Sequence, residues 1–331
     1  MLVHHDRVPG IYDEPDFYEA ACAYRDVPAE VDALLGWYRR YGGAGDPGSG
    51  VPRSVLELAA GPAEHARELA RRGIDATALD LSAAMCTRAR QAARAAGVRL
   101  SVVHGDMRDF AIPCEFDLAI TMLNSLCHLL TLDDMLAHLA SVARHLADGG
   151  LYIAELAHPA DFLTERRTNS EWTSEVDGGT VTVSWGGRAD VIDPVTQVTR
   201  EHVSVTHRGP DGAARTVTDV MPNRFWTATE LAAAIRLAGG FSVAARYGDF
   251  GAGVPVDAPE AWRMILVLRR TLVQWVQRGR HVGSVQRRVT LAAYRERRAA
   301  CEAVEARDAP EARKAPGTGS TPDRTRENSP R

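Results

Sequence analysis

The chain has 331 residues, of which 45% are hydrophobic and 25% charged, a composition typical of globular proteins with enough apolar material for a sizeable core. The formal net charge of −4 argues against the basic surface that nucleic-acid binding requires. Five cysteines at unrelated spacings indicate no zinc site, and no stretch is long and apolar enough for a membrane span or a signal peptide. We therefore expect a cytoplasmic protein with no nucleic-acid, membrane or metal partner.

Residues 1–50 are rich in tyrosine and predict an N-terminal helical lid followed by a linker. Residues 28–38 have helical spacing, and the glycine-rich run 41–50 is typical of a flexible connection. The aromatic side chains either pack against the core or cover a pocket. For Tyr12 and Tyr18 both interpretations stay open.

Residues 54–82 read as an apolar strand, a turn of small residues, a helix and a second strand that ends at Asp80. This order is typical of the first β-α-β unit of a doubly wound sheet, whose ligand pocket lies at the carboxyl ends of the strands. Gly61 lets a ligand approach the backbone closely, because a Cβ would clash there. An acid about 20 residues after such a turn commonly accepts hydrogen bonds from ribose hydroxyls, which predicts this role for Asp80.

The same turn favours a ligand without phosphate groups. A dinucleotide site needs several glycines and a helix N-terminus to hold a pyrophosphate. Here Gly61 is followed by Pro62 and Ala63, and the acid Glu57 precedes the turn. A carboxylate repels a pyrophosphate but suits a ligand with an ammonium group. S-adenosylmethionine (SAM) has a ribose, an ammonium group and a sulfonium, so the charge argument favours SAM over NAD as the cofactor.

The following residues continue the alternation of helices and strands. We expect helices at 83–96 and 132–147, with the glycine pair 149–150 as the cap of the second. We expect strands at 100–104, 116–121 and 151–156. Five strands interleaved with helices predict a doubly wound α/β sheet.

The pattern changes to period two between residues 180 and 221, with strands expected at 180–185, 197–205 and 215–220. This predicts a small antiparallel sheet inserted into the α/β domain. A helix at 227–238 and strands at 241–247 and 263–269 then resume the α/β pattern. We divide the chain into an N-terminal lid and linker (1–50), an α/β core (51–160), a β insert over the acceptor pocket (161–225), the rest of the core (226–270), a C-terminal helical extension (271–308) and a disordered tail (309–331).

Several stretches together resemble a known family. They are VLELAAG at 55–61, LDLSAAM at 79–85, HGDMRDF at 104–110 and FDLAITMLNSLCH at 116–128. In this order and spacing the chain resembles, over roughly residues 10–270, the class I SAM-dependent methyltransferases. It is most similar to small-molecule N-methyltransferases with a β insert, of the amino-sugar N,N-dimethyltransferase and glycine/sarcosine methyltransferase types. Where the family usually has a small polar residue and a glycine, this chain has Pro62 and Ala63.

The resemblance implies a Rossmann-like sheet of seven strands and an enzyme that moves a methyl group from SAM to a small-molecule acceptor by in-line displacement, with an amine nitrogen as the first choice. It also implies contacts to each part of SAM. Glu57 and the backbone of Ala59 to Gly61 would face the methionine part, and Asp80 would bind the ribose. Leu81 or Met85 would pack on the adenine ring, and Asp106 and the Met107 backbone would bind the adenine nitrogens. Met122 or Leu123 would lie near the sulfonium.

On the acceptor side, the resemblance points to His128 as a weak base and to Tyr12 as its partner from the lid. The alternative for His128 is a capping or packed residue. Glu155, inside an apolar strand, is either a buried hydrogen-bonded carboxylate near the site or an outward residue at a strand end. The further residues predicted to line the acceptor pocket are Tyr18, Asn124, His158, Arg224 and Trp226.

Other functions stay open at this point. The chain could methylate a hydroxyl of a natural product or a peptide terminus, or it could be a module that binds SAM or another nucleoside without catalysis. The sequence does not name the acceptor, and it leaves a homo-oligomer open.

Overall fold

The computed structural model describes residues 10–43, 50–163 and 170–271, except residues 177, 188 and 252. The predicted extension at 271–308 lies outside the described residues apart from residue 271, and the tail predicted at 309–331 lies wholly outside them. Most of the predicted linker, residues 44–49, lies outside them as well. Within the described part of the chain, no helix is both long and apolar enough to cross a membrane.

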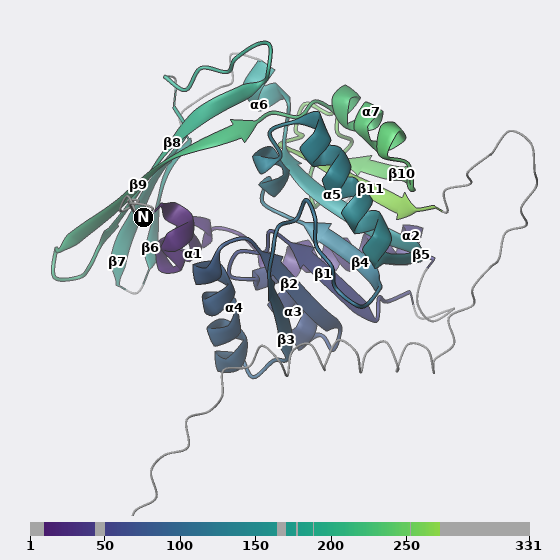
Figure 1. Cartoon of the computed structure of the whole chain (residues 1–331). Helices are drawn as coiled ribbons and strands as arrows, with labels where there is room; N and C mark the ends of the chain where they lie inside the picture. The colour runs from purple at the N-terminus through teal and green to yellow at the C-terminus, as the bar shows by residue number, and fades with distance from the viewer. Residues whose placement is uncertain are drawn as a thin grey trace, which may run out of the picture. The chain divides into compact units, whose positions relative to one another are not determined.

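The core is a seven-stranded sheet in the order β10-β11-β5-β4-β1-β2-β3, which confirms the predicted fold class (Figure 1). The neighbours from β5 to β3 pair in parallel, whereas β11 is antiparallel to both β5 and β10. The strands are β1 (Ser54–Leu58), β2 (Asp75–Asp80), β3 (Leu100–His104), β4 (Phe116–Thr121), β5 (Leu146–Ala157), β10 (Phe241–Tyr247) and β11 (Arg263–Arg270).

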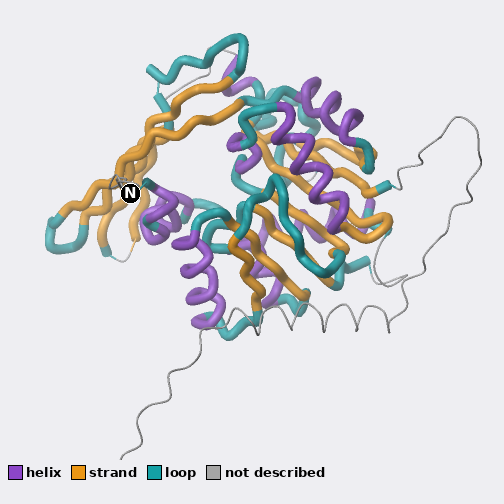
Figure 2. Tube along the Cα trace, viewed as in Figure 1, coloured by secondary structure: helices purple, strands orange, loops and turns teal. Residues whose placement is uncertain are grey.

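Helices cover both faces of this sheet, because alternate side chains of each strand point to opposite faces. Leu56 and Leu58 of β1 pack in the cluster that includes α5 (Leu132–His145) and α7 (Ala228–Ala238). Val55 packs in the other cluster, with α2 (Val27–Tyr41), α3 (Glu64–Arg71) and α4 (Ala83–Ala95). Figure 2 shows these helices in front of and behind the strands.

The insert is a four-stranded antiparallel sheet of β6 (Ser170–Val176), β7 (Gly179–Trp185), β8 (Val198–Arg208) and β9 (Ala214–Arg224). The sequence predicted three strands and missed β6. A short 3-10 helix, η1 (Ile11–Asp13), and α1 (Pro15–Cys22) pack their apolar side chains on this sheet. The N-terminal segment is therefore held by the insert as well as by the core. The short helix α6 (Ala160–Leu163) follows β5.

One predicted boundary was wrong. The helix expected at 132–147 ends at His145, and β5 begins at Leu146. The glycine pair expected as a helix cap lies inside this strand, where Gly149 has φ +76°. Leu146 pairs with Phe116 before an irregularity shifts the register to Leu118 and Leu151. The glycines therefore belong to an irregular start of β5. Such a start favours glycine for the same reason as a helix cap does, because the backbone adopts a positive φ there.

Candidate active site

A cavity of about 950 Å³ lies at the carboxyl ends of the parallel strands, beneath the N-terminal segment and the insert. Its wall combines residues from five regions of the chain. These are the N-terminal segment (Tyr12, Tyr18), the turn after β1 (Ala59, Gly61), the ends of β2 and β3 (Asp80, Leu81, Asp106, Met107), the segment after β4 (Asn124, Cys127, His128) and the insert (Trp172, Trp185, Glu201, Asp219, Asn223).

The turn after β1 has an unusual backbone. Ala59, Gly61 and Ala63 all have positive φ, of +50°, +54° and +60°. Two of the three are alanines, which adopt this region at a cost of roughly 1–2 kcal/mol each, so the surrounding contacts must hold the turn in place. One such contact is the hydrogen bond that the Gly61 N–H donates to Asp80 Oδ2 at 2.7 Å.

Asp80 joins the two halves of this β-α-β unit. Its Oδ1 accepts a hydrogen bond from the Ser82 N–H at 2.8 Å, while Oδ2 takes the Gly61 N–H. Burial raises the pKa of Asp80, although these two donors act in the opposite direction. A carboxylate has about four acceptor positions, so Asp80 can still accept hydrogen bonds from a ligand in the cavity.

Asp106, at the next strand end, is held by the guanidinium of Arg108 at 2.6 Å. Hydrogen bonds from Arg108 keep the pKa of Asp106 below its usual value. The neighbouring Met107 is buried, and its carbonyl accepts a hydrogen bond from the ring of His138 at 2.9 Å.

Tyr12 and His128 meet across the cavity. The Tyr12 hydroxyl oxygen lies 2.9 Å from His128 Nε2, with the two rings edge to face. Burial raises the pKa of Tyr12 well above 10 and lowers the pKa of His128, so both side chains are uncharged near neutral pH. The structure thus makes a neutral hydrogen-bonded pair from two residues that lie 116 positions apart.

Two contacts hold the N-terminal segment in the position that brings Tyr12 to His128. The Ser82 hydroxyl donates to the Tyr12 carbonyl at 2.8 Å, and the Ile11 N–H donates to Asp219 Oδ2 at 2.9 Å. The first contact comes from the core and the second from the insert. Tyr12 therefore bridges the two parts of the cavity wall.

The segment that carries His128 is also held in a strained conformation. Leu123 and Asn124 follow β4 with φ of +54° and +59°, before the 3-10 helix η2 (Ser125–His128). The Leu123 N–H donates to Glu155 Oε2 at 2.9 Å, and the Ala157 N–H donates to Asn124 Oδ1 at 3.0 Å. Since positive φ is rare for a residue as large as leucine, these contacts are needed to keep the segment in place.

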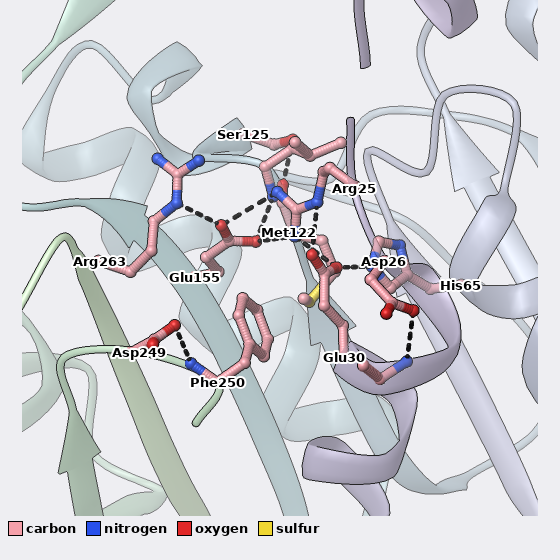
Figure 3. Close-up of polar contacts among 12 residues, drawn as sticks. Arg25, Asp26, Glu30, His65, Met122, Ser125, Glu155, Asp249, Phe250 and Arg263 are labelled. Carbon is pink, nitrogen blue, oxygen red and sulfur yellow. Dashed lines mark hydrogen bonds and ion pairs between the residues drawn. The ribbon is translucent and has the colours of Figure 1, made fainter. Parts of the chain in front are cut away.

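Glu155 is the centre of a buried ionic network (Figure 3). Its carboxylate lies 2.9 Å from Arg25 and 2.9 Å from Arg263, and its side chain is fully buried. Against the effect of burial, these two guanidiniums hold the pKa of Glu155 below its usual value. Glu155 is therefore the buried, hydrogen-bonded carboxylate of the two alternatives that the sequence left open.

The network continues from Arg25 to the turn after β1. Arg25 also contacts Glu30 at 2.5 Å, and Glu30 contacts His65 Nε2 at 2.7 Å. His65 Nδ1 lies 3.4 Å from Glu57, whose other oxygen accepts the Ala66 N–H at 2.7 Å. Burial disfavours a charged imidazole, but the hydrogen bonds to Glu30 and Glu57 raise the pKa of His65 to about 9.

 Of the sixteen predicted site residues, ten line the cavity. The ten are Tyr12, Tyr18, Ala59, Gly61, Asp80, Leu81, Asp106, Met107, Asn124 and His128. The role predicted for each of them stays a prediction.

The other six predicted residues lie outside the cavity wall. Glu57 points to the α3 face of the sheet and binds the Ala66 N–H, and Met85 and Met122 are buried in the core. His158 contacts the Val256 carbonyl at 2.8 Å. Arg224 stacks on the Trp226 ring at 3.9 Å, and Trp226 donates to the Leu129 carbonyl at 3.1 Å.

Sequence reasoning missed several residues of the wall, mainly those of the insert and Arg263. The period-two alternation could have assigned the side chains of the insert to two faces of its sheet. It could not have shown which of these faces borders the cavity. In the described part of the chain, no group of three or more His, Cys, Asp or Glu side chains could hold a metal ion.

Comparison with known proteins connects this cavity to methyl transfer. Residues 55–150 match the family model described as a methyltransferase domain. Over 102 residues the chain is 33% identical to a dTDP-3-amino-3,4,6-trideoxy-alpha-D-glucopyranose N,N-dimethyltransferase of Streptomyces venezuelae. That alignment covers 31% of this chain and 41% of the relative, so it spans less than half of the relative's length.

Two solved structures resemble the fold over most of its length. The crystal structure of DesVI from Streptomyces venezuelae has a TM-score of 0.61 at 25% identity and covers 78% of this chain and 98% of that chain. A S-adenosylmethionine-dependent methyltransferase from Clostridium acetobutylicum ATCC 824 has a TM-score of 0.63 at 17% identity, with 79% and 96% covered. At that identity the second likeness shows the fold alone.

Proposed function

We propose that this chain transfers a methyl group from SAM to an amine nitrogen of a small molecule. Its matched domain and its fold assign the chain to the class I SAM-dependent methyltransferases. The amino-sugar substrate in the name of the Streptomyces venezuelae relative makes an amino sugar the first acceptor to test. The support for this proposal comes from how the cavity wall fits a cofactor at one end and an amine at the other.

The cofactor end fits SAM. Gly61 has φ +54° and no side chain, so the backbone of its turn is open to a ligand. Asp80 and Asp106 would accept hydrogen bonds from the ribose hydroxyls and the adenine amine. Arg263 lines the cavity, and Figure 3 shows its two terminal nitrogens directed away from Glu155, so they would hold the carboxylate of the methionine part.

When bound, SAM supplies an activated methyl group: the amine lone pair forms the new N–C bond as the S–C bond breaks, S-adenosylhomocysteine is left, and the product ammonium loses a proton. The chain has to align the acceptor and exclude water. A cavity of about 950 Å³ is at the upper end of the roughly 300–1,000 Å³ of small-molecule sites, which suits a cofactor together with an acceptor.

The Tyr12–His128 pair is the observation that carries the choice of an amine. Both groups are uncharged near neutral pH, because burial raises the pKa of one and lowers the pKa of the other. A neutral imidazole or hydroxyl can accept an N–H hydrogen bond and orient the nitrogen lone pair without repelling an amine. The structure brings this pair to the wall that Gly61 and Asp80 also line.

Two measurements test the proposal. SAM binding by calorimetry should give a measurable affinity, and Asp80→Ala should weaken it about tenfold or more, because a hydrogen bond to a charged group is worth roughly 1.5–3 kcal/mol. Unchanged SAM affinity in this variant would contradict the cofactor site. Exposed Asp148 at the opposite end of the sheet provides the control Asp148→Ala, which should bind SAM like the wild type.

The second measurement is a mass-spectrometric search for the added methyl group across amines and hydroxyls. We expect a product on an amine, and we expect Tyr12→Phe and His128→Ala to slow its formation while SAM affinity changes little. If His128→Ala methylates the acceptor at the full rate, the pair has no part in the reaction. Methylation of hydroxyls alone would replace the amine by an O-acceptor.

A further inference from the structure

The buried ionic network around Glu155 lies directly behind the cavity wall. The side chains of Arg25 and Glu155 are 2% and 0% exposed, and neither residue lines the cavity. Leu123 does line it, and its backbone N–H donates to Glu155 Oε2 at 2.9 Å. Through this hydrogen bond the network reaches the segment that leads to His128.

The segment after β4 depends on such contacts. Leu123 and Asn124 are consecutive residues at φ +54° and +59°, a region that disfavours residues with a Cβ, and bulky ones most. A second contact, from the Ala157 N–H to Asn124 Oδ1 at 3.0 Å, attaches the segment to the end of β5. The chain then continues into η2, whose last residue, His128, meets Tyr12. A shift of Leu123 would therefore move His128.

Glu155 is itself held by the guanidinium of Arg25, which lies between two carboxylates (Figure 3). Arg25 Nη1 and Nη2 donate to the two oxygens of Glu155 at 3.1 and 2.9 Å, which makes a bidentate pair. Nε and Nη2 of the same group donate to Glu30 at 2.8 and 2.5 Å. These four hydrogen bonds fix the plane of the guanidinium. A lysine has three donors on one nitrogen and could not make all four.

Arg25 also connects the segment after β4 to the turn after β1. Its partner Glu30 contacts His65 Nε2 at 2.7 Å, and His65 Nδ1 lies 3.4 Å from Glu57. Glu57 accepts the Ala66 N–H at 2.7 Å, in the first turn of α3. One network therefore holds the segment that presents the reacting pair and the helix that follows the turn where SAM is proposed to bind.

We propose that Arg25 and Glu155 are positioning residues for methyl transfer. They hold Leu123 in place and thereby fix His128 opposite Tyr12. This inference rests on the proposed function and adds to it two residues that lie behind the cavity wall. Without their contacts the strained segment would relax, and the pair would no longer face the acceptor amine in one orientation. A misplacement of about 1 Å, even from a mutation far from the chemistry, can lower a rate about 100-fold.

Methylation kinetics at saturating SAM test this role. The acceptor is dTDP-3-amino-3,4,6-trideoxy-alpha-D-glucopyranose, the amino sugar in the name of the relative. Arg25→Lys keeps the buried positive charge but cannot bridge both carboxylates, so kcat should fall at least about tenfold, with a smaller change in KM. Glu155→Gln should lower kcat in the same way. Each kcat is divided by the fraction of folded protein, measured by urea unfolding under the assay conditions, which removes the effect of lost stability.

Asp117→Asn is the matched control. Asp117 is a buried carboxylate 3.1 Å from the Arg53 guanidinium, and it lies near the start of β4, at the opposite end of that strand from Leu123. The variant should also lose stability, because a buried ion pair is broken. Its corrected kcat should stay that of the wild type.

A double variant shows whether Arg25 acts through His128. Residues that act through one another have effects that do not add. In a His128→Ala protein, Arg25→Lys should therefore lower kcat by less than about twofold more. A loss by the same factor with and without His128 would show that Arg25 acts by another route.

Amide hydrogen exchange followed by NMR gives a readout that needs no acceptor. The Leu123 N–H lies outside helix and strand, but its hydrogen bond to Glu155 should protect it in the wild-type protein. This protection should fall at least about tenfold in Arg25→Lys, because Glu155 is then less firmly held. Asp117→Asn should change it much less.

Three results would overturn the inference: an unprotected Leu123 amide in the wild-type protein, corrected kcat values of Arg25→Lys and Glu155→Gln equal to that of the wild type, or equal losses with and without His128. The first is measured on the wild-type protein and therefore stands even if a variant does not fold. Each differs from failure of the proposed function. That failure would appear as the lack of SAM binding or of a methylated amine across the wider set of acceptors.

Discussion

The buried imidazole of His65 predicts that the protein loses stability between pH 6.5 and 8. Hydrogen bonds to Glu30 and Glu57 raise the pKa of His65 from 6.5 to about 9 against the effect of burial. Below pH 6.5 the imidazole is charged in both the folded and the unfolded chain, and the full stabilisation is present. As the pH rises, the unfolded chain releases this proton first, so stability falls until the folded pKa is passed.

The size of the effect follows from the pKa. A rise from 6.5 to about 9 corresponds to about 3 kcal/mol at roughly 1.4 kcal/mol for each tenfold change in proton affinity. About half of this should be lost between pH 6.5 and 8. Other perturbed groups change the stability little between pH 6.5 and 8. The pKa values of His128, His138 and His145 are lowered, so these histidines titrate below this range. Burial raises the pKa of the Cys22 and Cys127 thiols, so these titrate above it.

Urea unfolding followed by circular dichroism at pH 6.5, 7.25 and 8 measures this loss. The His65→Gln variant should be less stable at pH 6.5 and nearly independent of pH across the window. His104→Gln, which replaces an exposed histidine, should keep the slope of the wild type. A wild-type protein of constant stability from pH 6.5 to 8, or a His65→Gln variant with the same slope, would refute a charged His65.

Two further predictions concern the strained backbone around the cavity. Glu155→Gln leaves Arg263 without its buried counter-charge and Arg25 with Glu30 alone. It should lower the free energy of unfolding by about 3–5 kcal/mol, measured by urea unfolding, and a loss below about 1 kcal/mol would contradict the role of the network. Gly61→Ala places a Cβ at φ +54° and should cost roughly 1–2 kcal/mol of stability, with weaker SAM binding by calorimetry. Gly73→Ala, also at positive φ but beyond the other end of α3 and outside the cavity wall, should cost stability without changing SAM affinity.

The sequence predicted the α/β sheet because its strands and helices have local, periodic patterns. The same β-α-β unit predicted the turn at Gly61 and the strand end at Asp80, because the order of strand, turn, helix and strand sets their separation in the sequence. The missed strand β6 shows the limit of this reasoning. Its sequence, SEWTSEV, alternates weakly, and its pairing with β7 supplies what its own residues do not.

The ionic network could not be predicted, because its members come from distant parts of the chain. Arg25 meets Glu155 across 130 positions, and no local pattern marks that pairing. Glu155 did give a signal, as a carboxylate inside an apolar strand. Which residues would neutralise it depends on how the N-terminal segment packs on the sheet, and only the structure shows that packing.

The contacts of the N-terminal segment also set the order in which the cavity can form during synthesis. Ile11 and Arg25 leave the ribosome early, but their partners Asp219 and Glu155 follow 208 and 130 residues later. Until then their polar groups are solvated by water, and the part of the cavity wall that contains Tyr12 has no insert to pack against. Non-local contacts of this kind slow folding. The cavity should therefore be among the last parts of the molecule to take shape, completed only after β9 has been made.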